Sequence, residues 1–156
     1  MGFFTADMCD EYGDNLQVAE HIFTNYGKRE KFSGKAVTIM IDEDNRGLIE
    51  LLKEDGKGKV AIVDVGATFC AVVGENLMLL AEKNGWEGII INGYVRDTHI
   101  TKGIDVGLLA LGTCPKRSSK KADSKREVEL NFAGVTFKDG CEVFVDHDGV
   151  VVRKNF

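Results

Sequence analysis

Proline, closely spaced cysteines and long apolar runs are scarce in this chain of 156 residues. Its one proline is Pro115, and its four cysteines, Cys9, Cys70, Cys114 and Cys141, form no C-x-x-C pair. This spacing argues against a zinc cluster, so we expect reduced, buried thiols in a cytoplasmic protein. No apolar run approaches the ~20 residues that cross a bilayer, which argues against a membrane protein.

The charge of the chain and its first residues exclude two further classes. A net charge of −5 disfavours nucleic-acid binding by the surface as a whole. The segment Met1–Asp14 is acidic and has no basic apolar leader, so we expect no signal peptide. With 44% hydrophobic and 29% charged residues and no evident linker, residues 1–156 are expected to form a single domain.

The central part of the chain alternates between strand and helix patterns. Hydrophobic periodicity predicts strands over Phe32–Ile41, Val60–Val65, Gly88–Ile91 and Ile104–Leu111. It predicts helices over Asn45–Glu54, with Asn45 as the cap, and Phe69–Lys83, which Gly74 either interrupts or reopens for a second half. This alternation is typical of parallel crossover units.

The two ends of the chain have a different texture. Thr5–Tyr12 is predicted to be a short helix capped by Thr5, and Asn15–Phe23 a weakly helical or irregular stretch. After Asn131, three short strands separated by glycine turns are predicted at Val135–Phe137, Glu142–Val145 and Val150–Val152. The expected fold is therefore an α/β core with a β-rich C-terminal part.

The most informative segment for function is residues 88–97. Ile89–Ile91 reads as a buried strand, and Asn92-Gly93 follows with two residues that tolerate positive φ. Arg96 and Asp97 come directly after. Arginine binds a carboxylate in bidentate fashion and aspartate holds hard divalent cations, so the pair is a candidate site. The alternative is a plain surface salt bridge at a strand end.

Two other features are weaker candidates. Gly74-Glu75-Asn76-Leu77 could open a helix whose free N–H groups bind an anion, or it could be a glycine kink in a packing helix. His99 lies two residues from Asp97 and could share its site, or be an ordinary surface histidine.

A basic stretch stands out in this acidic chain. It could bind RNA or an acidic partner, or be a solvated loop, and the lack of interleaved aromatic residues favours the loop. Its charged residues are Lys116, Arg117, Lys120, Lys121, Lys125 and Arg126.

Several of these motifs together resemble the family of the regulator of ribonuclease E activity A, which also contains metal-dependent 4-hydroxy-4-methyl-2-oxoglutarate aldolases. The resemblance extends over nearly the whole chain. Its central motifs are Gly74–Leu77, Gly85-Trp86-Glu87-Gly88 and Asn92–Asp97. Cys9–Tyr12, Asn131–Phe137 and Asp148–Val151 resemble the terminal signatures of the family.

The resemblance implies a fold and an assembly. It implies a three-layer α/β sandwich of the swivelling-domain type, with a mixed central sheet. It also implies homotrimers or pairs of trimers, with the pocket between neighbouring subunits.

The resemblance also implies roles for the candidate residues. Arg96 would hold the pyruvyl carboxylate, and Asp97 would bind a divalent cation, Mg²⁺ or Mn²⁺, with waters as most of the other ligands. Gly74, Glu75, Asn76 and Leu77 would bind substrate, and Glu75 would steer a metal-bound water. The expected reaction is retro-aldol cleavage of a small 2-oxo acid to pyruvate, with oxaloacetate decarboxylation as a side activity.

Two functions follow from the family, and the sequence has features of both. Arg96-Asp97 favours the lyase, whereas the N-terminal segment and Trp86-Glu87-Gly88 look more like the regulator branch, whose members bind ribonuclease E. Bacterial aldolases of the family often have a longer tail that gives an acidic residue to the neighbouring pocket, and this chain ends at Phe156. A third reading is a trimer that uses the pocket for another small 2-oxo acid.

Overall fold

The computed structural model describes residues 2–153 of the chain. No helix within these residues is both long and apolar enough to span a membrane. The helical elements are α1 (Thr5–Tyr12), the 3-10 turn η1 (Gly13–Asn15), α2 (Arg46–Leu52), α3 (Glu75–Lys83) and α4 (Thr98–Thr101).

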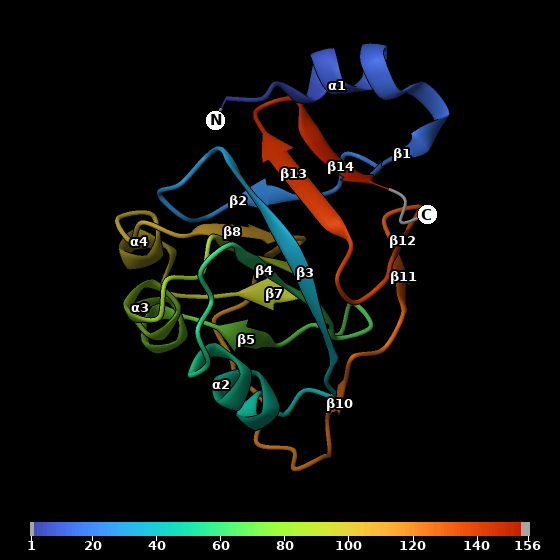
Figure 1. Cartoon of the computed structure of the whole chain (residues 1–156). Coiled ribbons are helices and arrows are strands. Elements are labelled where there is room, and N and C mark those ends of the chain that lie inside the picture. Colours follow the sequence, from blue (N-terminus) through green and yellow to red (C-terminus); the bar gives the residue numbers. More distant parts are fainter. Residues whose placement is uncertain (1, 154–156) are drawn as a thin grey trace.

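The strands form one large mixed sheet and two small sheets (Figure 1). The large sheet has the order β1 (Leu16–Val18), β14 (Gly149–Arg153), β13 (Glu142–Asp146), β3 (Phe32–Met40), β4 (Lys59–Asp64), β6 (Gly88–Asn92), β8 (Gly107–Ala110), β2 (Thr24–Asn25), with β10 (Lys125–Arg126) beside β3. The small sheets are β5 (Ala71–Val73), β7 (Tyr94–Val95), β9 (Gly112–Thr113), and the hairpin β11 (Leu130–Phe132), β12 (Val135–Phe137).

The parallel centre of the large sheet confirms the predicted crossover units. β3, β4, β6 and β8 are neighbours and run parallel, whereas the strands that join at the β1 and β2 edges pair antiparallel. Side chains alternate between the two faces, so Ile89 and Ile91 lie in one hydrophobic cluster and Ile90 in the other. Continuous apolar runs such as Gly88–Ile91 are needed because this sheet is covered on both faces.

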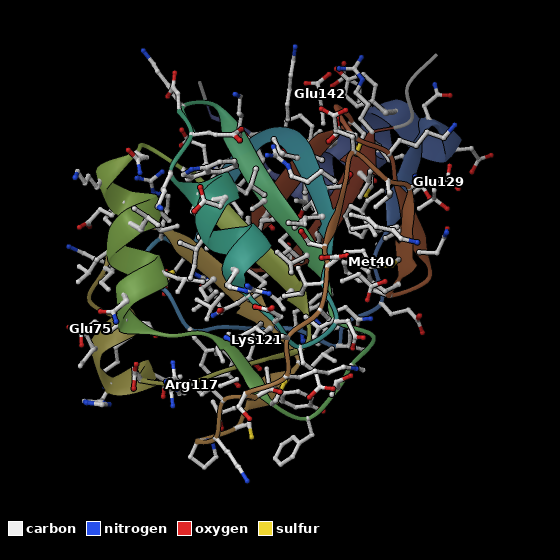
Figure 2. All side chains as sticks on the ribbon, turned by 90° about the horizontal axis from the view of Figure 1, so that it is seen from below. Met40, Glu75, Arg117, Lys121, Glu129 and Glu142 are labelled. Carbon is white, nitrogen blue, oxygen red and sulfur yellow. The ribbon has the colours of Figure 1, made fainter. Side chains whose placement is uncertain are left out.

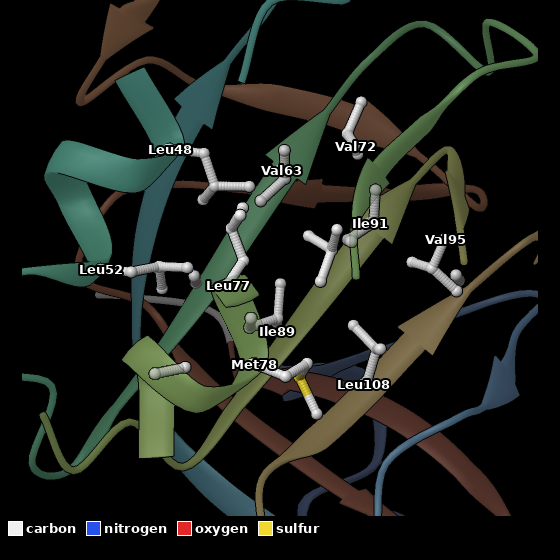
Figure 3. Packing of buried hydrophobic residues seen from close by; sticks show 14 of the residues in the cluster. Leu48, Leu52, Val63, Val72, Leu77, Met78, Ile89, Ile91, Val95 and Leu108 are labelled. Carbon is white, nitrogen blue, oxygen red and sulfur yellow. The ribbon is translucent and has the colours of Figure 1, made fainter. Parts of the chain in front are cut away.

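Helices cover one face of the large sheet. The helices α2, α3 and α4 lie on the same side of it in Figure 1. Leu48 and Leu52 from α2 and Met78 from α3 pack with strand residues in the larger cluster, as Figure 3 shows. The opposite face packs against the β11–β12 hairpin, whose Phe132 and Phe137 belong to the second cluster.

One sequence expectation near the N-terminus is wrong, and another holds only in part. Helix α1 spans Thr5–Tyr12 as predicted, but Thr5 is its first helical residue and Phe4 occupies the cap position. The N–H and hydroxyl of Thr5 instead donate to the Asp146 carboxylate, at 2.8 and 2.7 Å. The Thr5 side chain therefore makes a long-range contact and does not cap the helix. Asn15–Phe23 contains no helix beyond the last residue of η1, and its part Leu16–Val18 is the edge strand β1.

Three further corrections concern the centre of the chain. The predicted helix Phe69–Lys83 begins only at Glu75, because Ala71–Val73 is strand β5, so Gly74 opens the helix. Asn45 stands at the start of α2 without capping it, since its side-chain amide donates to the Val72 carbonyl. Neither Asn92 nor Gly93 has a positive φ.

The strands near residues 88–111 are shifted only slightly. β6 extends the predicted strand to Asn92, and the strand expected over Ile104–Leu111 is shorter, Gly107–Ala110. The three predicted C-terminal strands are confirmed as β12, β13 and β14.

A glycine pair makes room for the buried ring of Phe32. Gly88 and Gly107 are directly paired on β6 and β8. A Cβ built on them would lie 2.3 and 2.1 Å from atoms of the Phe32 ring, which is only 3% exposed. The ring therefore rests on backbone at this position.

We expect Gly88→Ala to lower the free energy of unfolding by about 1–3 kcal/mol, the usual cost of overpacking a core. Chemical denaturation of the variant beside Gly103→Ala measures this, because a Cβ at Gly103 meets only an ordinary contact of 3.5 Å. Equal stability of the two variants would contradict the proposed packing. Adding Phe32→Leu to Gly88→Ala is expected to restore part of the loss.

Asp44 fastens a long loop to the start of α2. Its side chain is 4% exposed, and it accepts hydrogen bonds from the side chain and N–H of Arg46 and from the N–H of Ala122. These donors, the Arg46 guanidinium first, hold the pKa of the Asp44 carboxyl well below its ordinary value.

A carboxyl whose pKa is lower in the folded chain stabilises the fold above its unfolded pKa, and this contribution is lost as the pH falls below it. We therefore expect the free energy of unfolding to fall with acidification below about pH 4. Denaturant titrations at several pH values are expected to show a shallower fall for Asp44→Asn. An identical pH dependence of the variant and the parent protein would refute this role.

Candidate active site

The candidate residues Arg96 and Asp97 come directly after strand β7 of the three-stranded sheet β5–β7–β9, the small sheet. After β6 ends at Asn92, the chain leaves the large sheet and forms β7, which pairs with β5 and β9. The N–H of Arg96 donates to the Val73 carbonyl at the end of β5, at 2.9 Å. This bond places Arg96-Asp97 beside Gly74, the residue before helix α3.

Asp97 has a left-handed backbone conformation, with φ 61° and ψ 33°. Such values are uncommon outside glycine, although aspartate tolerates them better than most residues. Its Oδ2 accepts a hydrogen bond of 3.1 Å from the N–H of Glu75, at the start of α3. The helix N-terminus favours a negative charge here, and the hydrogen bond holds the carboxylate in one orientation.

Gly74 is required by this contact for steric reasons. Its φ of −145° and ψ of −152° are extended values, so backbone freedom does not explain the glycine. A Cβ at this position would lie 2.6 Å from Asp97 Oδ2 and 3.4 Å from Arg96 Cγ. The glycine thus lets both side chains approach the start of α3.

Arg96 and Asp97 do not neutralise each other. No ion pair within 4.0 Å joins them, or joins either of them to another charged group among residues 2–153. The Arg96 guanidinium has one long contact, 3.4 Å from Nη1 to the Pro115 carbonyl. The alternative of a plain salt bridge is therefore wrong, and both half-buried charges are available to a ligand.

The four residues Gly74–Leu77 play unequal parts. Glu75 is half-buried, Asn76 is exposed, and the side chain of Leu77 is in the hydrophobic core at 8% exposure. Leu77 could therefore contact a ligand only through its backbone. Within residues 2–153 the N–H groups of Asn76 and Leu77 have no acceptor, as expected in the first turn of a helix.

A divalent cation fits the donor set at Asp97. Its second oxygen, Oδ1, has no hydrogen-bond partner in the part of the chain that the structure describes. The same residues contain no cluster of three or more histidine, cysteine or acidic side chains placed to hold a metal. Because Mg²⁺ keeps several waters and often uses one or two carboxylates, Asp97 alone is a sufficient protein ligand.

Two hollows among the described residues lie elsewhere. One of about 340 Å³ lies between α1 and the β13–β14 turn, and one of about 380 Å³ lies at the end of β3 and β4. Neither is lined by Arg96 or Asp97. In one subunit the two residues therefore lie outside these hollows, and the pocket expected between subunits stays a prediction.

The remaining sequence candidates are separate from this site or inconclusive. His99 is exposed on α4, two residues after Asp97, and its role in the site stays a prediction.

Two of the six charged residues of the basic stretch form ion pairs with acidic residues of the same chain. Lys120 pairs with Asp42 at 2.8 Å, and Arg126 pairs with Glu54 at 2.7 Å. Figure 2 shows Lys121 and Arg117 on the loop that contains this basic stretch. The pairing supports the interpretation of a surface loop over that of an RNA site.

Sequence patterns missed two features that build the site. The first is the small sheet, because strands of two or three residues give too short a pattern to recognise. The second is the contact of Gly74 with Asp97, which are 23 residues apart in the sequence. The glycine was a visible signal, but the sequence did not reveal which side chain needed the space.

Comparisons with known proteins agree in family and differ in the names given to its members. A protein of Dechloromonas aromatica, provisionally named a 4-hydroxy-4-methyl-2-oxoglutarate aldolase, is 45% identical over 97% of this chain and 96% of its own length. A solved structure from Thermus thermophilis, named the RNA-processing inhibitor RraA, has 34% identity and a TM-score of 0.93, covering 98% of this chain and 93% of its own.

A third relative has yet another name. A Geobacillus kaustophilus structure named S-adenosylmethionine: 2-dimethylmenaquinone methyltransferase has 38% identity and a TM-score of 0.94, covering 99% of this chain and 96% of its own. The sequence model of the family described as RraA-like, Aldolase/RraA, matches residues 5–152. The fold, the coverage and this match agree: the chain belongs to the RraA-like family.

Proposed function

We propose that this protein is a divalent-metal-dependent lyase that cleaves 2-oxo acids of the 4-hydroxy-4-methyl-2-oxoglutarate type to pyruvate, with oxaloacetate decarboxylation as a side activity. The observation that carries the proposal is the pair of uncompensated charges, Arg96 and Asp97, at the start of α3. The aldolase names of relatives at about 45% identity support it.

The proposed site binds the substrate by its negative end. Arg96 binds the carboxylate next to the keto group, for which its planar guanidinium offers two parallel donors. The free N–H groups of Asn76 and Leu77 add positive potential from the start of α3. Asp97 would hold the divalent cation, and Glu75, whose N–H donates to Asp97 Oδ2, would position water.

Cleavage breaks the C3–C4 bond of the substrate. The C4 hydroxyl loses its proton and becomes a carbonyl, while the electron pair of the broken bond remains on the pyruvate enolate, which is then protonated at C3. A bound divalent cation would supply positive charge beside the enolate oxygen. Arg96 contributes a second positive charge and fixes the orientation of the pyruvyl group.

The proposed assembly is a homotrimer or a pair of trimers, with the three-layer fold of swivelling-domain type that the family resemblance implies. A second subunit would then close the open side of Arg96 and Asp97. The position of both residues outside the hollow beside α1 and the hollow at the end of β3 and β4 is consistent with a site completed by a neighbour.

We expect Asp97→Ala to reduce Mg²⁺- or Mn²⁺-stimulated pyruvate release by about 100-fold, because the cation loses its only protein ligand. Coupled detection of pyruvate from 4-hydroxy-4-methyl-2-oxoglutarate measures this. Asp97→Asn keeps an oxygen for the Glu75 N–H while removing the charge, so it should fold normally and also lose activity. Asp10→Asn, on the exposed side of α1, is the control. Unchanged activity of Asp97→Ala would count decisively against the lyase.

The second candidate function is regulation of ribonuclease E. The observation that favours it is the likeness to the structure named RNA-processing inhibitor RraA. This function would use the outer surface, so it does not compete with a pocket. We expect a pull-down with purified ribonuclease E to retain the protein at modest salt if this function holds. The absence of binding under those conditions would remove the regulator hypothesis and leave the lyase untouched.

A further inference from the structure

A segment of four residues, Cys114–Arg117, crosses the small sheet from one edge to the other. At the β9 edge, the N–H of Cys114 donates to the Val95 carbonyl at 3.0 Å. At the β5 edge, the Lys116 carbonyl accepts from the N–H of Ala71 at 2.8 Å, and Arg117 forms a parallel bridge with Ala71. Between these two edges, the Pro115 carbonyl receives the Arg96 contact.

This crossing segment delivers Arg117 to the same strand that leads to the candidate site. Ala71, its bridge partner, is the first residue of β5, and β5 ends one residue before Gly74. Figure 2 shows Arg117 toward the same corner of the molecule as Glu75, the first residue of α3. Backbone hydrogen bonds on both sides hold the segment in place, so the position of Arg117 relative to Arg96 is fixed by the sheet.

Arg117 is also an uncommitted charge. It is exposed, and it forms no ion pair or side-chain hydrogen bond with any of residues 2–153. Lys120 and Arg126 in the same basic stretch are both paired with carboxylates. The guanidinium of Arg117 therefore has no structural partner to give up when a ligand binds.

We infer that Arg117 binds the distal carboxylate of dicarboxylic 2-oxo acids and thereby selects them over monocarboxylic ones. This inference rests on the proposed function, in which Arg96 binds the carboxylate next to the keto group. A dicarboxylic substrate brings a second negative charge, and a second guanidinium matches it in charge and in bidentate geometry. Arg117 is a specificity-determining residue and takes no part in bond cleavage.

Lys116 provides a matched comparison within the crossing segment. It is also an exposed cation, but adjacent side chains in an extended segment point to opposite sides. Its position in the sequence and its charge are nearly those of Arg117, and from this alternation we expect its side chain to point away from that of Arg117. A general effect of local positive charge would be the same for both residues, and a specific contact would not.

Calorimetric titration in the presence of Mg²⁺ tests the inference with two inert ligands of equal carbon number. 2-Oxoglutarate has the distal carboxylate and 2-oxopentanoate lacks it, and neither has the 4-hydroxyl group needed for retro-aldol cleavage. We expect the parent protein to bind 2-oxoglutarate about tenfold or more tightly, as one charge-assisted contact predicts. Arg117→Gln is expected to remove this difference without changing the affinity for 2-oxopentanoate, and Lys116→Gln to preserve it.

The inference is overturned if the parent protein binds both acids equally or binds neither. It is equally overturned if Arg117→Gln weakens both acids alike, or if Lys116→Gln has the same effect as Arg117→Gln. A pyruvate-release assay on the same preparations separates the two proposals. Selective binding of 2-oxoglutarate through Arg117 without any cleavage of 4-hydroxy-4-methyl-2-oxoglutarate would support the inference and contradict the lyase.

Discussion

The contact between the Asp97 carboxylate and the first N–H of α3 is the constraint on which the candidate site depends. It requires a left-handed aspartate and a residue without a Cβ at Gly74. Together these features hold an anion against the positive end of a helix, with one oxygen left for a ligand. Backbone strain at a functional residue is tolerated when the surrounding structure fixes it, and here β5, β7 and α3 all do so.

The large sheet and the small sheet differ in what they contribute to the structure. The large sheet buries two apolar clusters and is specified by close packing, such as the Phe32 ring on its glycine pair. The small sheet is short and leads directly into Arg96 and Asp97, which have no ion-pair partner among residues 2–153. Loops and short strands on a rigid scaffold are a common place for binding residues, since they can vary without loss of the core. Arg117 is a further example, since it lies on the crossing segment Cys114–Arg117, which is bonded to the small sheet.

The sequence predicted the parts of the fold whose elements are long enough to show a hydrophobic pattern and have a buried face. The parallel strands and the C-terminal strands were found because Ile89–Ile91 and Val150–Val152 are continuous apolar runs. β5 was mistaken for helix because Ala71–Val73 is too short to show its own period and precedes a real helix. Arg96 and Asp97 were chosen as candidates from residue type and position. That the two side chains form no ion pair with each other could not be predicted, because it depends on contacts with Gly74 and Pro115, which are remote in the sequence.

A crystal structure of the protein with Mg²⁺ and pyruvate would test directly whether Arg96 and Asp97 bind substrate and cation. We expect the cation to bind Asp97 Oδ1 and the Arg96 guanidinium to leave the Pro115 carbonyl for the pyruvate carboxylate. Asp97 Oδ2 should keep its bond to the Glu75 N–H. Pyruvate and cation bound away from these residues, for instance in the acidic hollow at the end of β3 and β4, would contradict this expectation.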